Sequence, residues 1–353
     1  MTISELLALR LYNQRLLHSE FTTPDQVVKW FGAIQAQEMP ISFYAFGLRI
    51  PGSTEVAIEQ ATTDKTIVRT WPMRSTLHFV PADDTLWMTR LLGPRQNRKT
   101  ASIYRNLGIT EGQLSKARSV LENSLSETPT PRQQVYELLE SHGIDTKGSK
   151  GAHLMRYWAQ EGLLCQGPRS GKQQTFVLLR AWIPDAEQPS TEEALALLAR
   201  RYFQSHGPAT IQDFMWWSGL TKTEAQQGIG AIKNDFTSED IAGKNYIFYP
   251  LVAPKTQLQH PPLLLPPFDE YTVAYADRSA VMGTADMKAV GYGIDPNIII
   301  NGQSVGRWKR VTKGRGVAVQ LSPFQELSPA THAAITAAAQ RYAAFIGTDV
   351  SVF

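Results

Sequence analysis

The segment GAIQAQEMP occupies residues 32–40, and the rest of the chain can be understood by working outward from it. An amphipathic stretch at residues 24–31 runs into this segment and is predicted to be a helix. Thr23 is a suitable N-cap, and Gln26 stands where a capping box has Glu or Gln. Pro24 suits the first helical position, and Gly32 suits the helix end. The helix therefore delivers the chain into the segment at a defined point.

Two glutamines, Gln35 and Gln37, lie in this segment with one small apolar residue between them. If the piece is extended, both side chains point to the same side of the backbone. Each amide offers one acceptor and one donor group, so the pair can hold a water molecule or contact a base edge. An amide does not titrate near neutral pH and cannot serve as an ordinary general base. The alternative is that both glutamines are solvated loop residues or bond to nearby backbone.

Helices followed by a terminal hairpin, the pattern of a winged helix-turn-helix domain, occur three times along the chain. The predicted hairpins span residues 66–80, 163–179 and 236–251. Predicted helices precede the second hairpin at residues 131–141 and 147–162, and the third at residues 192–204, 210–218 and 222–233. Three units of this length are too few and too divergent for a solenoid, so we interpret them as tandem domains.

A different pattern fills the C-terminal part of the chain. Strand-like runs at residues 297–302 and 304–309 meet at Asn301 and Gly302, a strong hairpin signal, and a helix is predicted at residues 329–346. We therefore expect an α+β protein of three tandem winged helix-turn-helix units followed by a small β-rich C-terminal domain. The predicted parts are residues 1–93 (first winged helix with an N-terminal helix and an insertion), 94–127 (basic helical connector), 128–185 (second winged helix), 190–255 (third winged helix) and 256–353 (C-terminal domain).

Composition limits the classes of protein that this sequence can encode. The 353 residues suffice for two or three domains, and a hydrophobic fraction of 42% provides material for their cores. Cys165 is the single cysteine, which excludes an internal disulfide and suits a reducing compartment. The sequence shows no secretory signal and no apolar run near the length of a membrane span. We expect a cytoplasmic monomer that makes no contact with a membrane.

Positive charge is concentrated in parts of the chain although the net charge is only +3. Residues 90–118 contain seven bases and one acid, and residues 307–315 contain five bases and no acid. Such patches fit a polyanionic partner, although a solvated basic surface is the ordinary alternative. The predicted helix at residues 222–233 carries few side chains suited to reading bases. Recognition of the DNA backbone and shape is therefore favoured over recognition of a sequence.

The sequence lacks the common signatures of catalytic and metal sites. It contains no Cys/His cluster of zinc spacing, no phosphate-binding glycine-rich loop and no nucleophile elbow, so neither a metal nor a cofactor is expected. His78 and His206 are isolated in the sequence and are expected to be packed or hydrogen-bonded. Structural duty is also the favoured interpretation of the pair Trp216–Trp217, as core residues, and of Asp269 and Glu270, although the two carboxylates can also face a site.

Three segments together resemble a known family. They are GAIQAQEMP at residues 32–40, VRTWPMRSTLHFVP at residues 68–81 and LLPPFDEY at residues 264–271. In this order they resemble the AlkZ-like bacterial DNA glycosylases, tandem winged-helix proteins related to the YcaQ glycosylases. The similarity runs through nearly the whole chain. The Gln-x-Gln pattern is weakly specific by itself, whereas its combination with the second segment is fairly specific.

The resemblance implies a basic cleft with a Gln-apolar-Gln motif at its centre, which falls on Gln35 and Gln37. A sister branch carries Gln-apolar-Asp, so this sequence belongs on the Gln-Gln side. The implied reaction is hydrolysis of the N-glycosidic bond of purines alkylated at N7 or N3, including bulky or interstrand-crosslinked lesions in double-stranded DNA. The two amides would position water and stabilise the cationic sugar. The motif contains no lysine for a Schiff base, so monofunctional chemistry is expected.

Basic residues near these segments are the candidates for contacts with DNA. Arg69, Arg74 and His78 are expected to line the cleft. The candidates for phosphate contacts are Arg95, Arg98, Lys99, Lys150, Arg169 and Lys172. The residues expected on the hairpin after Gly302, which is a candidate for probing a groove, are Arg307, Lys309 and Arg310.

Two rival functions remain compatible with the sequence. One is a non-catalytic winged-helix DNA-binding protein, such as a transcription regulator, which would show a sequence-specific footprint. The other is a glycosylase that protects a producer from its own genotoxin. The sequence leaves open which lesion is the substrate, which groove is entered, and what roles Glu38 and Asp269 have.

Overall fold

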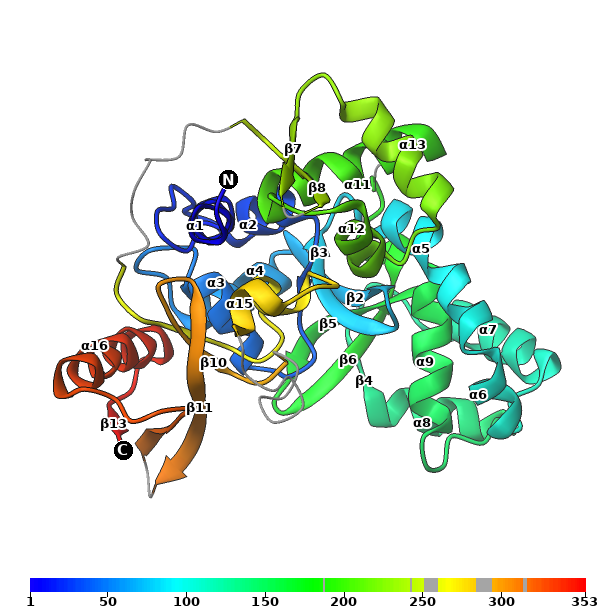
Figure 1. Ribbon diagram of the computed structural model, residues 1–353. Coiled ribbons are helices and arrows are strands. Elements are labelled where there is room, and N and C mark those ends of the chain that lie inside the picture. Colours follow the sequence, from blue (N-terminus) through cyan, green and yellow to red (C-terminus); the bar gives the residue numbers. More distant parts are fainter. Residues whose placement is uncertain (187, 242, 251–259, 284–293, 314–315) are drawn as a thin grey trace. The chain divides into compact units, whose positions relative to one another are not determined.

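The computed structural model describes residues 1–186, 188–241, 243–250, 260–283, 294–313 and 316–353. The chain forms two compact units: a split unit of Met1–Ile58 with Leu195–Phe353, and an inserted unit of Glu59–Ala194 (Figure 1). Both units contain helices and strands, which confirms the predicted α+β class. No helix in the described ranges is long and apolar enough to cross a lipid bilayer.

The inserted unit contains two of the predicted hairpins, and they belong to one sheet. Its strands run in the order β3-β2-β5-β6-β4, all antiparallel, and β2 pairs with β5 at Arg69 and Gln166. Helices α5 and α9 pack against this sheet. The elements are β2 (Ile67–Met73), β3 (Thr76–Pro81), α5 (Thr85–Lys99), α6 (Ala101–Asn106), α7 (Glu111–Ser124), β4 (Thr130–Pro131), α8 (Arg132–Ser141), α9 (Lys150–Gln160), β5 (Leu164–Ser170), β6 (Gln173–Leu178) and α10 (Leu179–Trp182).

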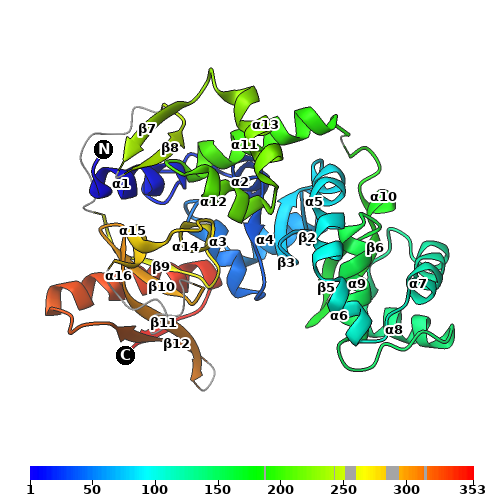
Figure 2. The same ribbon diagram turned by 45° about the vertical axis from the view of Figure 1, so that its right-hand side comes forward.

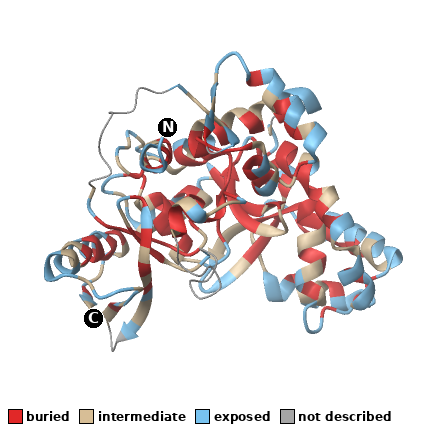
Figure 3. Cartoon of the chain, in the orientation of Figure 1, coloured by how far each residue is buried: buried red, intermediate tan, exposed pale blue. Residues whose placement is uncertain are grey.

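Close packing of α5 against the end of α9 depends on one glycine. A Cβ at Gly93 would lie 1.9 Å from the backbone oxygen of Gln160, so no larger residue fits there. The core of this unit is built around buried apolar residues of α7, α8, α9 and the β5–β6 hairpin, including Leu121, Val135 and Phe176. Figure 3 shows buried residues along β2 and β3, whereas the turn end of the β5–β6 hairpin is exposed.

The split unit carries the N-terminal helices, the third hairpin and the C-terminal sheet. Helices α4 (Glu55–Thr63) and α11 (Thr191–His206) cross from one unit to the other. The remaining elements are α1 (Ile3–Asn13), α2 (Pro24–Phe31), β1 (Ile34–Gln35), η1 (Ile41–Phe43), α3 (Tyr44–Gly47), α12 (Ile211–Ser218), α13 (Lys222–Ile232), β7 (Thr237–Ile241), β8 (Lys244–Phe248), β9 (Leu263–Leu265), α14 (Glu270–Val273), α15 (Ser279–Met282), β10 (Asn297–Ile300), β11 (Gln303–Lys313), β12 (Gly316–Pro323), α16 (Pro329–Ile346) and β13 (Val350–Val352).

The C-terminal sheet has the strand order β13-β12-β11-β10-β9, and α16 packs against β9 and β13 (Figure 2). Asn301 and Gly302 join β10 to β11 with φ values of 50° and 78°, the left-handed conformation that an Asn-Gly turn favours. The predicted hairpin at these residues and the predicted helix at residues 329–346 are confirmed. The division into three winged-helix domains and one C-terminal domain stays a prediction.

Two local predictions hold only in part: the extended conformation through Gln35 and Gln37, and the core position of both Trp216 and Trp217. The extended conformation of the Gln-x-Gln segment ends at Gln35, because the chain bends at Gln37 and then turns at residues 39–40. Of the tryptophan pair, Trp217 is fully buried, whereas Trp216 is 48% exposed and donates to the backbone oxygen of Val273. Adjacent residues of a helix differ by about 100° in direction, and here that difference leaves Trp216 at the edge of the buried face of α12.

A buried ion pair joins the N-terminal helices to the second half of the split unit. Arg49 and Asp269 are both fully buried, and the guanidinium donates to both carboxylate oxygens at 2.8 and 2.9 Å. The other donors of Arg49 reach the backbone oxygens of Ala45 and Gln14 and the side-chain oxygen of Gln14. All five N–H donors are thus bonded, which is the condition for tolerating a buried charge.

We expect Asp269→Asn to destabilise the protein by about 3–5 kcal/mol, because the change leaves the charge of Arg49 buried and uncompensated. Urea denaturation would measure this loss. The matched control is Glu122→Gln, which breaks the exposed pair between Arg118 and Glu122 on α7. That change should cost about 0.5 kcal/mol or less. Equal effects of the two substitutions would contradict a structural role for the buried pair.

Candidate functional site

Helix α2 and the glycine after it position the start of the Gln-x-Gln segment. Thr23 and Gln26 form a capping box at the helix start, as predicted. Gly32 ends the helix with φ of 81°, a conformation that favours glycine. A Cβ at Gly32 would lie 3.4 Å from the ring of Trp217, so the chain also passes close to α12 at this point. The backbone that enters the motif is therefore positioned by helix α2 before it and by the ring of Trp217 beside it.

The two glutamines have different surroundings. Gln35 is 7% exposed and lies at the end of β1, with the fully buried Ala36 after it. Gln37 and Glu38 are both exposed. A buried amide next to an exposed one suits a position at the wall of a cleft, where one side chain is fixed and the other meets solvent or a ligand.

A buried carboxylate holds the backbone of Gln35. The N–H of Gln35 donates to Oε1 of Glu270 at 2.8 Å. The other oxygen, Oε2, accepts from the indole N–H of Trp217 at 3.0 Å and contacts Nε2 of His206 at 3.3 Å. Glu270 is 1% exposed. Residues from β1 and from the consecutive helices α11 and α12 therefore converge on this one side chain.

A strained turn brings Glu270 to this place. Phe268 has φ of 61°, the left-handed region that non-glycine residues rarely adopt, and its N–H donates to the backbone oxygen of Ile294. Asp269 follows and caps α14 through the N–H of Tyr271 at 3.0 Å, while it also binds Arg49. The structural duty predicted for Asp269 is confirmed, and Glu270 is the first residue of the helix that Asp269 caps.

Burial and hydrogen bonding act in opposite directions on His206. Burial lowers the pKa of His206, and the hydrogen bond to Glu270 raises it by less. The neutral ring carries its proton on Nε2, because Nε2 faces a carboxylate oxygen that accepts. Nδ1 lies 2.8 Å from the hydroxyl oxygen of Ser205, which itself donates to the backbone oxygen of Arg201 at 2.6 Å. The expectation of a packed, hydrogen-bonded His206 is confirmed.

A cavity of about 830 Å³ begins where the motif ends. Its wall includes residues 38–41, Phe268 and a basic stretch of β11 that contributes Arg307, Lys309 and Arg310. Arg307 pairs with Asp295 at 3.2 Å, and Arg310 lies 3.4 Å from the hydroxyl of Tyr342. Lys309 is exposed. The structure thus brings the three predicted hairpin cations together with the segment that follows Gln37.

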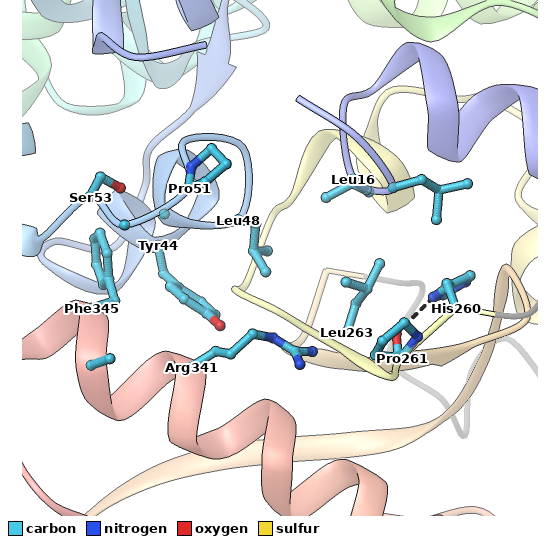
Figure 4. Close-up of a pocket in the computed structure, with 14 residues that line it drawn as sticks. Leu16, Tyr44, Leu48, Pro51, Ser53, His260, Pro261, Leu263, Arg341 and Phe345 are labelled. Atoms are coloured by element: carbon cyan, nitrogen blue, oxygen red, sulfur yellow. Dashed lines mark hydrogen bonds between the residues drawn. The ribbon is translucent and has the colours of Figure 1, made fainter. Parts of the chain in front are cut away.

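A second cavity in the same unit, of about 510 Å³, has a different character. Leu48, Leu263, Phe345 and other apolar side chains line most of it, with Arg341 at one side (Figure 4). The guanidinium of Arg341 donates to the backbone oxygen of Pro262 at 2.7 Å. None of the predicted site residues lines this cavity, so it is not the candidate site.

The predicted DNA contacts of the first hairpin lie in the inserted unit and are largely enclosed. Arg69 is 4% exposed and donates to the side-chain oxygen of Gln166 at 2.6 Å. Burial lowers the pKa of Arg69 to about 9, so its guanidinium is still charged at neutral pH. His78 is fully buried, and its Nε2 lies 3.2 Å from Arg74. These contacts hold the hairpin together, and a direct contact with DNA stays a prediction.

The predicted phosphate contacts of the inserted unit fall into two groups. Three have partners within the unit: Arg95 donates to the backbone oxygen of Leu91, Lys150 pairs with Asp145, and Arg169 pairs with Glu59. The exposed ones are Arg98, Lys99 and Lys172. In the described part of the chain, no group of three His, Cys, Asp or Glu residues is arranged to hold a metal ion.

Comparison with known proteins agrees with the resemblance seen in the sequence. The model of the family described as "DNA glycosylase AlkZ-like" matches residues 28–345. The chain belongs to the AlkZ-like DNA glycosylase family. It is similar to the "Interstrand DNA cross-link repair glycosylase" of Streptomyces sahachiroi, with 23% identity over 347 residues that cover 91% of this chain and 90% of the relative. The solved structure of Streptomyces sahachiroi DNA glycosylase AlkZ shares its fold, with a TM-score of 0.79, 22% identity and coverage of 100% and 99% of the two chains.

Sequence reasoning on this AlkZ-like chain missed the link between Glu270 and the motif. It named both Asp269 and Glu270 and favoured structural duty for the two. The available signal was that both segments, GAIQAQEMP and LLPPFDEY, carry the resemblance, although nothing in their order shows that they touch. The contact joins two residues 235 positions apart, which no local pattern in the sequence relates.

Acid should weaken the fold through His206. Its pKa is lowered in the folded chain, so below the ordinary value of about 6.5 the unfolded chain binds more protons. The corresponding stability is complete above pH 6.5 and is lost as the pH falls below it. We expect His206→Gln, which retains a donor toward Glu270, to reduce the loss of stability between pH 7.5 and pH 5.

Urea denaturation of wild type and His206→Gln across that range would measure the difference. Titrating groups that do not contact His206 contribute equally to both proteins and cancel in the comparison. Parallel stability curves for the two proteins would show that His206 does not contribute to the acid sensitivity.

Proposed function

We propose that this protein is a DNA glycosylase that hydrolyses the N-glycosidic bond of alkylated purines in double-stranded DNA. Substrates alkylated at N7 or N3, including bulky and interstrand-crosslinked lesions, fit the proposal. The observation that supports it most is the placement of the Gln-x-Gln motif. Gln35 is buried and fixed through its backbone to Glu270, and the exposed Gln37 leads into a cavity with basic side chains. Membership of the AlkZ-like family and the activity named for the Streptomyces sahachiroi relative point the same way.

The chemistry that we propose needs no strong acid at the base. Alkylation at N7 or N3 makes the purine cationic, so the glycosidic bond breaks with its electron pair going to a good leaving group. Positive charge develops at the sugar, and the oxygen of a water molecule bonds to C1′ and releases one proton to solvent. The side-chain oxygens of Gln35 and Gln37 would accept hydrogen bonds from that water and stabilise the sugar cation. No residue of the motif forms a covalent intermediate, so the proposed enzyme is monofunctional.

The exposed cations would hold the DNA backbone. Arg98, Lys99, Lys172 and Lys309 are accessible to phosphates, whereas the paired cations Arg169 and Lys150 would have to exchange a carboxylate for a phosphate. The β10–β11 hairpin, which carries Arg307, Lys309 and Arg310, is proposed to enter a groove. We also propose that three winged-helix domains and the C-terminal sheet provide these surfaces, with the protein acting as a monomer.

We expect Gln35→Ala and Gln37→Ala each to slow base release by about 100-fold, because each change removes a dipole directed at the developing charge. Single-turnover excision of one N7-methylguanine from a duplex would measure the rate, with DNA affinity measured in parallel at the same salt concentration. Gln60→Ala, on the exposed face of α4, is the matched control and should be unchanged.

If wild type binds tightly but releases neither N7-methylguanine nor a crosslinked lesion, the glycosylase proposal fails. A non-catalytic DNA-binding protein would then explain the binding. Loss of affinity in the two motif variants, with no separate loss of rate, would assign the glutamines to binding and contradict their catalytic role.

A phosphate contact at Lys309 should appear in the salt dependence of binding. We expect Lys309→Ala to lower the slope of log K against log salt by about 0.9, with a similar loss for every DNA sequence. Arg200→Ala is the control, because Arg200 is paired with Asp235 and lies outside both basic stretches of the chain. Equal slopes for wild type and Lys309→Ala would remove Lys309 from the interface.

A further inference from the structure

We propose that Glu270 is a positioning residue for the reaction, which acts by fixing the backbone of Gln35 and thereby the direction of its side-chain amide. This inference rests on the proposed glycosylase activity. It concerns a residue outside the Gln-x-Gln motif, separated from it by more than two hundred positions in the chain.

The geometry at the two oxygens of Glu270 supports this role. Oε1 accepts the N–H of Gln35 at 2.8 Å, whereas Oε2 accepts the indole N–H of Trp217 and contacts His206. The carboxylate is thus fixed at one oxygen by α11 and α12 and offers its other oxygen to the motif. Moving it would move Gln35, because the hydrogen bond joins the peptide unit that carries the Gln35 side chain.

The surroundings keep Glu270 itself from shifting. The ring of His206 stacks on Tyr202 with centroids 4.7 Å apart, and the ring of Trp217 lies 5.1 Å from that of Tyr202. On the other side, the neighbouring Asp269 is tied to Arg49 by two hydrogen bonds. Both the donors to Glu270 and the backbone before it are therefore immobilised by contacts that do not involve the motif. Contacts of this kind around a catalytic side chain keep that side chain within the small range of geometries in which it can react.

Burial of a carboxylate at this position is costly unless all its contacts are used, and an apolar residue could fill the same space without that cost. A buried carboxylate nevertheless contacts the chain where the strand β1 ends and the motif begins. A role in packing alone would not require an acceptor at Oε1. The acceptor is needed because the N–H of Gln35, at the last residue of β1, must be bonded in a buried place.

Replacement of Glu270 by Gln tests the role without changing the size of the side chain. The new amide oxygen fits best at the Oε2 position, where two donors converge. The amide NH2 then faces the N–H of Gln35, and two donors oppose each other. The substitution is thus directed at the bond to the motif, while the contacts with Trp217 and His206 persist.

The experiment measures single-turnover excision of N7-methylguanine and DNA affinity for wild type, Glu270→Gln and Asp213→Asn. Asp213 is a matched control, since it is a buried carboxylate of the same unit that accepts from Thr210 and Ala276 instead of the motif. We expect Glu270→Gln to slow excision at least tenfold with affinity unchanged within twofold. Asp213→Asn should lower thermal stability but leave the excision rate within twofold of wild type.

Equal excision by Glu270→Gln and wild type would overturn the inference, as would an equal loss of rate in Asp213→Asn, which would indicate general loosening of the fold. If Glu270→Gln does not fold, Trp217→Phe decides, because it removes one donor to Oε2 and keeps an aromatic ring. A several-fold slower excision by this variant supports the inference, and an unchanged rate overturns it. If wild type itself excises nothing, both the proposed function and this inference fail. If wild type is active and Glu270→Gln is equally active, only the inference fails.

Discussion

The buried pair of Arg49 and Asp269 is the interaction on which the split unit depends. Arg49 follows the short helix α3, and Asp269 precedes α14, so the pair ties together parts of the chain separated by the whole inserted unit. The connection extends further, because Gln14 binds both Arg49 and Tyr275, and the hydroxyl of Tyr275 donates to the backbone of His206. A buried guanidinium is tolerated only where every donor is bonded. That requirement fixes the register of four segments around one point.

The candidate site is built on this support. Asp269 and Glu270 are adjacent, and their carboxylates serve two sides of the same turn: one binds Arg49, and the other accepts the N–H of Gln35. The rigid part of the site is therefore the buried turn at Asp269 and Glu270, which contacts the motif from the interior of the unit. Gln37 is on the solvent-exposed side of the motif. This arrangement suits a reaction in which neutral amides act by position and not by changing their protonation state, because such groups contribute only while they are held in place.

Local patterns in the sequence predicted much of the fold. The capping box at Thr23, the Asn301–Gly302 turn and the helix α16 depend on residues within a few positions of one another, and all three are found where the sequence placed them. The end of the extended segment at Gln35 and the exposure of Trp216 were not predicted, since both depend on what packs against the chain. The same holds for Glu270. Its spacing from Gln35 carries no local signal, and the two residues meet only in the folded chain, after a turn in which Phe268 adopts a left-handed conformation.

The exchange rate of the Gln35 amide proton tests most directly whether Glu270 holds the motif. It can be followed by hydrogen–deuterium exchange of the uniformly ¹⁵N-labelled protein, with Glu270→Gln beside wild type. In wild type the Gln35 amide should exchange as slowly as the amides of the protected core strands of the split unit. In Glu270→Gln it should lose most of that protection, while the core amides keep theirs. Rapid exchange of Gln35 in wild type, at the rate of the exposed residues that follow it, would contradict the account.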